Sequence, residues 1–263
     1  IRLIKEKPIT LYSTIVSMSI VTTSTSDILM NGLCMAGKKT FRMCPGISWY
    51  LWSCTFPPAF RKKLRYNTLD QDETVNTAAL YKLLEGYNAH IISGHTHFNT
   101  NVCFNDSLME HNTAAVCGTW WRADINVDGT PRGYGIYEVN GDQLKWIYKS
   151  AGYPLEHQFH AYPAGSSDEY PSDIIANVWN WDDLWKVEWY ENGQRMGEMQ
   201  KYKGYDPMAK VICSDKEKVK YDWISPVLTE HLFHATPHDP NARLEIKVTD
   251  RFGNVYTQTI ENK

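Results

Sequence analysis

Long hydrophobic runs are missing from this 263-residue sequence. Every apolar stretch is broken by Ser, Thr, Asn or a charged residue, well short of the roughly 20 residues that cross a bilayer. We therefore expect no transmembrane helix, and no signal peptide pattern is present. The six cysteines lack C-x-x-C spacing, which argues against a zinc ribbon or a disulfide framework. Neither a Gly-x-Ser-x-Gly turn nor a complete P-loop occurs, so the chemistry of those motifs is not indicated.

Histidine and acidic residues are scarce in the first part of the chain. None of the nine histidines precedes His90, and Asp27 is the only aspartate before Asp70. Residues 1–65 contain ten Lys or Arg against two acidic residues, a net charge of +8, whereas residues 66–263 contain 17 against 28, a net charge of -11. The densest basic run, Arg61–Arg65, is either a solvated turn or a surface for anionic partners.

The most informative feature present is the segment Ile91–His97, an apolar run that breaks at Gly94 into His95-Thr96-His97. A glycine at the end of a buried strand allows a tight turn, and two imidazoles separated by one residue then face one ion or a pair of ions. We interpret His95 and His97 as metal ligands. The alternative is that they merely share a strand face and form hydrogen bonds.

Several further segments accompany this motif: Tyr66–Asp70, the helix-like Thr77–Leu84, Glu110–Trp121 and Asp128–Tyr134. Together with Gly94–His97 they resemble calcineurin-like metallophosphoesterases, from about Tyr66 to the C-terminus. Gly-His-Thr-His in that order is fairly specific to this superfamily, and the tryptophan-rich run is similar to its bacterial multidomain members.

The resemblance implies a two-metal hydrolase in which His95 binds one ion and His97 the other. Divalent Mn, Zn or Fe ions about 3.5–4 Å apart activate a bridging hydroxide and stabilise charge on a phosphoryl group. Trp120 and Trp121 are candidates to line the substrate cleft. Their alternative interpretation is ordinary packing in a core or between domains.

The family's remaining ligands come from Asp-x-His, Gly-Asp-x-x-Asp, Gly-Asn-His and a lone histidine, and none of these is present in this chain. Where the family would place the lone histidine, just after Ile9–Tyr12, the residues are Ser13-Thr14-Ile15. We therefore expect the C-terminal portion of a metallophosphoesterase with no complete catalytic site and a low metal occupancy. Because the resemblance fades over Ser13–Arg65, a shifted reading frame there is a further hypothesis.

We expect two domains. Residues 1–150 should form a partial α/β layered domain, of which residues 1–65 are anomalous, and residues 151–169 should form a linker. A helix is expected over Thr74–Tyr87. Strands are expected at Ala89–Ser93, Thr100–Phe104, Thr113–Val116, Tyr134–Val139 and Leu144–Tyr148, with a hairpin turn at Asn140–Asp142.

Residues 170–263 should form an all-β, immunoglobulin-like sandwich. Its strands are expected to include Ile174–Trp179, Trp185–Tyr190 and Leu244–Thr249. We expect several of the tryptophans at 179, 181, 185 and 189 to fill its core, and a sugar-stacking platform is the less favoured alternative. The pairs His157-x-x-His160 and His231-x-x-His234 lack nearby Cys or paired carboxylates, so we interpret them, like His111, as structural or surface histidines.

Two classes of function remain. The chain is either a fragment of a metal-dependent phosphomonoesterase or phosphodiesterase, which acts when intact on a phosphate-ester small molecule or an envelope component, or a non-catalytic module whose β-sandwich contacts envelope glycans or proteins. The resemblance implies export to the periplasm or cell envelope, and no nucleic-acid partner is expected. Substrate, native metal and oligomeric state have no signature in the residues.

Overall fold

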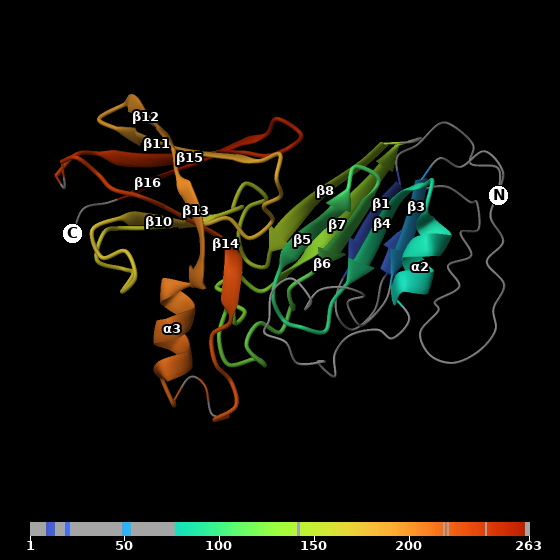
Figure 1. Cartoon of the computed structure of the whole chain (residues 1–263). Helices are drawn as coiled ribbons and strands as arrows, with labels where there is room; N and C mark the ends of the chain where they lie inside the picture. Colours follow the sequence, from blue (N-terminus) through green and yellow to red (C-terminus); the bar gives the residue numbers. More distant parts are fainter. Residues whose placement is uncertain are drawn as a thin grey trace.

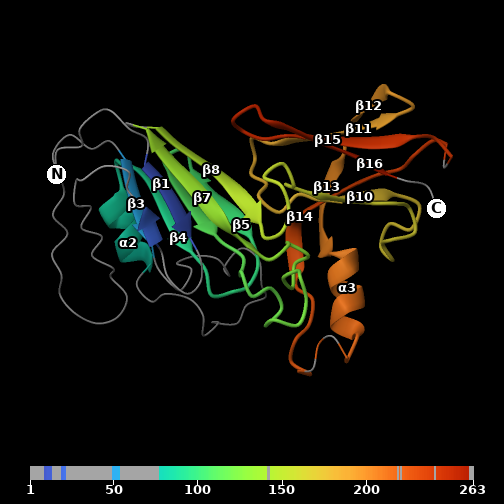
Figure 2. The same cartoon turned by 180° about the vertical axis from the view of Figure 1, so that it is seen from behind.

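The computed structural model describes residues 9–13, 19–21, 49–53, 77–140, 143–217, 219, 221–239 and 241–260. The basic run Arg61–Arg65, the segment Tyr66–Asp70, the turn residues 141–142 and most of Ser13–Arg65 lie outside the described residues. The described residues are mostly β, and their strands form four sheets of four. Figures 1 and 2 show these sheets as two bodies lying side by side.

In the described residues, the first body contains two sheets and the helix α2 (Thr77–Leu84). One sheet has the order β2 (Ser19–Val21), β1 (Ile9–Ser13), β7 (Gly133–Asn140), β8 (Gln143–Ser150), and the other the order β3 (Trp49–Ser53), β4 (Asn88–Ser93), β6 (Leu108–Asn112), β5 (Thr100–Asn105). Strand β4 runs parallel to both β3 and β6, whereas all pairs in the sheet of β7 are antiparallel.

The sheets of the first body pack face to face, and the helix α2 (Thr77–Leu84) covers the outer face of one of them. Ile92 and Met109 of one sheet meet Tyr137 and Trp146 of the other. On the opposite face of β4, Ile91 packs against α2. Strand β4 is therefore buried on both faces, as its continuous apolar run predicts.

The second body is formed by two antiparallel sheets that enclose the largest core cluster. One sheet has the order β13 (Gln200–Tyr205), β14 (Leu228–Ala235), β10 (Ile174–Asn177), β9 (His160–Tyr162), and the other the order β12 (Gln194–Glu198), β11 (Lys186–Glu191), β15 (Leu244–Thr249), β16 (Val255–Ile260). Ile174 and Phe233 of the first sheet pack against Trp189 and Ile246 of the second. Strand β9 lies within the predicted linker.

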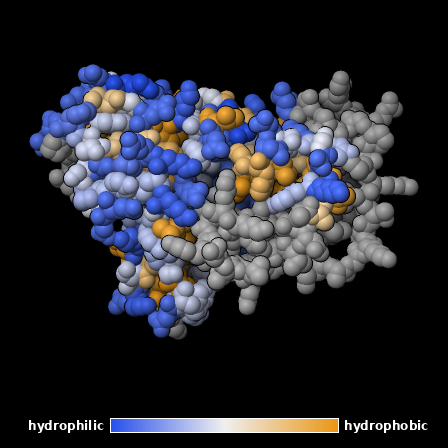
Figure 3. Space-filling model, viewed as in Figure 1, coloured by the Kyte–Doolittle hydropathy of each residue, from blue (hydrophilic) through white to orange (hydrophobic). Residues whose placement is uncertain are grey.

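The prediction of an all-β second half is wrong at one place, because α3 (Pro207–Ser214) follows β13. Asp206 caps this helix by accepting a hydrogen bond from the Ala209 N–H, and Pro207 occupies its first turn, a combination typical of helix starts. Figure 3 shows a hydrophobic area over α3, where Val211 is 69% exposed.

The predicted strand Thr113–Val116 is also wrong. The strand, β6, lies at Leu108–Asn112, and the backbone then leaves the sheet. The N–H of Ala114 donates to the Asn99 side chain and the N–H of Ala115 to the Asn126 side chain. Because side chains satisfy these groups, the chain turns here without a partner strand.

Within the described part of the chain, no helix combines the length and the apolar character that a membrane crossing requires.

Candidate functional site

The predicted histidine pair lies in the loop that leaves β4. His97 is buried and its Nδ1 lies 3.1 Å from the carbonyl oxygen of Gly118. A carbonyl only accepts hydrogen bonds, so Nδ1 carries the proton and the Nε2 of the neutral ring keeps its lone pair. Burial lowers the pKa of His97; the hydrogen bond with the Gly118 carbonyl opposes this effect, and the proximity of His95 adds to it. The ring is therefore neutral at pH 7 with its lone pair on Nε2, which is the protonation state of an imidazole that binds metal.

An aromatic stack extends from His97 to the protein surface. The ring of His97 lies 4.2 Å from that of Trp120 at an interplanar angle of 11°. Trp120 meets Trp223 edge to face at 4.7 Å. Trp121 is 74% exposed, so the interpretation of this residue as core packing is wrong. Trp120 thus supports the ring of His97, whereas the side chain of Trp121 is exposed to solvent.

Strained backbone conformations occur at the same histidines and tryptophans. Positive φ angles occur at His95 (76°), His97 (57°), Trp120 (48°) and Trp121 (64°), and among the described non-glycine residues only Asn192 shares this feature. The left-handed region is unfavourable for bulky side chains and costs of order 1–3 kcal/mol per residue. Such conformations persist only where surrounding contacts hold them.

Asn112, at the end of β6, makes some of the contacts that stabilise these backbone conformations. Its Nδ2 donates to Thr96 Oγ1 at 2.6 Å and to the Phe98 carbonyl at 2.9 Å. Behind it, Ser93 Oγ donates to Glu110 at 2.7 Å and to Asn112 Oδ1 at 3.3 Å. Asn112 therefore positions the loop that carries both histidines. The sequence did not reveal this role, because the strand is predicted at Thr113–Val116 and lies at Leu108–Asn112.

The described residues do not complete a metal site. In the described ranges, no group of three His, Cys, Asp or Glu side chains is arranged to hold an ion. His95 and His97 supply two imidazoles, whereas a two-metal site needs several further ligands, including a bridging one. The residues present therefore do not fit a complete two-metal centre, and no reaction step is assigned to one.

Most histidines of the second body have carboxylate partners that the sequence did not reveal. His231 Nε2 lies 3.2 Å from Asp128 Oδ2, and His234 Nδ1 lies 2.6 Å from Asp173 Oδ2. These carboxylates are 103 and 61 residues away in the sequence, so spacing could not show them. Both contacts agree with the structural interpretation of these two histidines.

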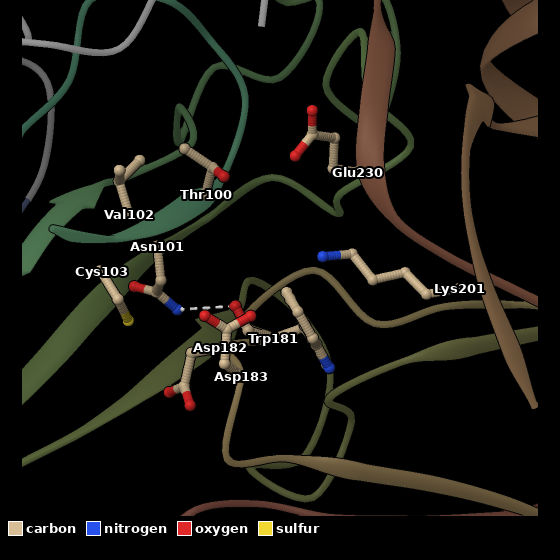
Figure 4. Close-up of a pocket in the computed structure, with 9 residues that line it drawn as sticks. All are labelled: Thr100, Asn101, Val102, Cys103, Trp181, Asp182, Asp183, Lys201 and Glu230. Carbon is tan, nitrogen blue, oxygen red and sulfur yellow. Dashed lines mark hydrogen bonds between the residues drawn. The ribbon is translucent and has the colours of Figure 1, made fainter. Parts of the chain in front are cut away.

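A small pocket of about 60 Å³ lies where the two bodies meet (Figure 4). Asn101 of β5 donates to the carbonyl of Trp181 at 3.3 Å, and Lys201 lies 3.5 Å from the centre of the Trp181 ring. On its other side, Asn101 Oδ1 contacts His111 Nδ1 at 2.8 Å, and His111 contacts His90 at 2.9 Å. This pocket is too small for an organic substrate, and its contacts join the two bodies.

The sequence matches a known protein family. A family model described as the C terminal of calcineurin-like phosphoesterase matches residues 110–256. No curated protein matches the chain. The matched region begins within β6 and includes Trp120, Trp121 and nearly all of the second body, whereas His95 and His97 precede it.

Proposed function

The chain belongs to the calcineurin-like phosphoesterases through their C-terminal domain, and we propose from this premise that it is part of a metal-dependent phosphoesterase. His95 and His97 contribute to the metal centre of the intact enzyme. The reaction of that enzyme is the hydrolysis of a phosphomonoester or phosphodiester. Its remaining ligands belong to motifs that this sequence does not contain, so the chain by itself is inactive.

The state of His97 supports this proposal most directly. Its Nδ1–H is held by the Gly118 carbonyl, and a backbone carbonyl on the second ring nitrogen is the usual companion of a metal-binding histidine because it fixes the ring and the tautomer. Divalent Mn, Zn or Fe ions would supply Lewis acidity at this position, with low occupancy in this chain.

We propose that Trp121 and Trp120 line the cleft that receives the substrate. The exposed indole of Trp121 lies next in sequence to the ring that stacks on His97. Exposed aromatic rings beside a reactive site offer apolar surface to the organic part of a ligand. The substrate class is a phosphate-ester small molecule or an envelope component.

The proposal extends to architecture and location. The layered first body, residues 1–150, corresponds to part of an α/β phosphoesterase domain, residues 151–169 to a linker, and residues 170–263 to an immunoglobulin-like accessory sandwich. Export to the periplasm or cell envelope follows from the family resemblance.

Metal binding tests the role of His97 without relying on activity. Purified chain is titrated with Mn²⁺ and Zn²⁺ by calorimetry, together with His97→Ala and the control His238→Ala, whose imidazole lies at the surface of the second body. We expect weak binding that His97→Ala removes and His238→Ala retains. Equal binding by all three proteins would contradict the assignment, and two tightly held ions per chain would contradict the low occupancy.

Hydrolysis of bis(p-nitrophenyl) phosphate with added Mn²⁺ tests the second part of the proposal. We expect no turnover above that of His97→Ala. Metal-dependent turnover that disappears in His97→Ala would show that the chain is a competent enzyme and overturn its proposed inactivity. Absence of both metal binding and turnover would overturn the enzyme-fragment proposal and favour the non-catalytic binding module.

A further inference from the structure

A second, larger pocket lies away from the histidine loop, between the segment 122–131, the segment 153–162 and α3. Its volume is about 500 Å³, within the range of about 300–1,000 Å³ that small-molecule sites occupy. Its lining includes His157 and His160, the pair whose spacing the sequence analysis singled out and the proposed function does not use.

The walls of this pocket are largely aromatic. Tyr153 stacks on His157 at 4.2 Å and 19°, and the His157 ring lies 5.1 Å from that of Trp179. His160 meets Tyr162 edge to face at 4.5 Å. Tyr153 is 47% exposed, whereas Trp179 is fully buried. The exposed Tyr153 ring can thus receive the flat face of a ligand, whereas the buried Trp179 supports the His157 ring from within.

The polar groups of the pocket are incompletely satisfied. Nδ1 of His157 and Nε1 of Trp179 are buried and have no hydrogen-bond partner among the described residues. Burial lowers the pKa of His157 to about 4 and also lowers that of His160, so both rings are neutral at pH 7. A neutral imidazole offers one donor and one acceptor, which matches hydroxyl groups, because these also donate and accept.

A cation without an ion pair stands at the exposed edge of the pocket. Arg122 lines it and is exposed, and in the described ranges no carboxylate pairs with it. Its neighbour Asp124 pairs with Arg132 at 3.1 Å instead. The guanidinium is therefore available for an anionic group, which arginine binds with two parallel hydrogen bonds. A metal is not the ligand, because no third His, Cys, Asp or Glu of the described part joins the two histidines.

We propose that this pocket binds a sugar that carries one anionic group, with the ring against the exposed side of Tyr153, hydroxyl groups at His157 and His160, and the anion at Arg122. The site is independent of the proposed phosphoesterase centre, since it uses none of its residues.

The test is calorimetric titration of the purified chain with a panel of hexose and pentose 1-phosphates. Glucose, which has the ring without the anion, and glycerol 3-phosphate, which has the anion without the ring, serve as comparison ligands. At least one sugar phosphate should bind about tenfold more tightly than either comparison ligand, as one charge-assisted contact predicts. Saturable binding by no member of the panel would overturn the proposal.

Two surface substitutions assign the contacts. Arg122→Ala should remove the preference for the phosphorylated sugar and leave the affinity for glucose unchanged, whereas Tyr153→Ala should weaken the binding of both by about three- to tenfold. The matched controls Arg243→Ala and Tyr205→Ala change exposed residues elsewhere on the second body and should bind like the unmodified chain. Sugar-phosphate binding that neither Arg122→Ala nor Tyr153→Ala alters would contradict this site.

Discussion

At the scale of single residues, Gly129 occupies a position that excludes every side chain. Its φ is +84°, and a Cβ built there would lie 2.1 Å from the carboxyl carbon of Asp206. Both carboxylates of this region, Asp128 and Asp206, are fully buried. The turn at Gly129 brings its backbone against α3, and the absence of a side chain is what allows the two segments to meet.

Gly129→Ala should therefore destabilise the protein by about 3 kcal/mol, because it combines left-handed backbone strain with overpacking of a buried carboxylate. Gly253→Ala is the matched control, since Gly253 has the same φ of +84° and nothing within 4 Å of its Cβ position. It should cost only about 1 kcal/mol. Urea denaturation measures both, and equal losses would contradict the packing argument.

The residues that sequence could identify are those whose signal is local. Gly94, His95 and His97 lie within four positions of one another, so their turn and pairing were readable before the fold was known. Asn112 reaches the same loop from β6, 16 residues after Thr96. Such a contact depends on strand register, which the sequence analysis placed incorrectly.

At the scale of elements, one carboxylate, that of Asp206, both caps α3 and connects this helix to neighbouring strands. Asp206 caps the helix through Ala209 N and accepts hydrogen bonds from Tyr162 Oη at 2.7 Å and Asn177 Nδ2 at 2.8 Å. Burial raises the pKa of Asp206, and these donors oppose that effect. The helix start is thereby joined to β9 and β10.

Asp206→Ala should lower the free energy of unfolding by about 3 kcal/mol, because it removes the cap and the acceptor of two further buried hydrogen bonds. The control Asp168→Ala removes an exposed ion pair with Lys210 and should leave stability nearly unchanged, as is usual for surface pairs. Chemical denaturation with circular dichroism gives both values. A loss no larger than that of the control would show that water replaces the missing acceptor.

The elements show why α3 was missed. The all-β prediction rests on strand alternation in residues 170–263 and takes no account of the dipeptide Asp206-Pro207, although that pair is a helix-start signal by itself. In contrast, β4, β5, β7, β8, β11 and β15 were placed within one or two residues. Their apolar patterns are long and bounded by turn residues, so the local sequence was sufficient to locate these strands.

At the scale of the whole molecule, buried histidines make stability depend on pH. Burial, with a smaller effect from Arg251, lowers the pKa of His90 to about 4, below the value of about 6.5 expected in the unfolded chain. Protons therefore bind more tightly to the unfolded state. The stability contributed by the neutral ring is complete above pH 6.5 and is lost as the pH falls from 6.5 toward 4.

We expect the free energy of unfolding to fall by about 2 kcal/mol between pH 6.5 and pH 5 on account of His90. His90→Gln should reduce that slope, with His111 still contributing, whereas His238→Gln at the surface should keep it. Urea titrations at pH 7.5, 6.5 and 5 measure the three slopes. If His90→Gln keeps the full pH dependence of the free energy of unfolding, His90 is not the origin of that dependence.

The side chain of Asp128 gathers partners from both halves of the chain. The N–H of Asn99, at 2.8 Å, comes from the loop after the histidine pair, and His231, at 3.2 Å, comes from β14. Cutting the chain between residues 150 and 170 would put Asp128 and His231 on different polypeptides, each with a buried polar group deprived of its partner. The two halves should consequently be hard to produce as separate stable proteins, and mixing them should restore structure that neither has alone.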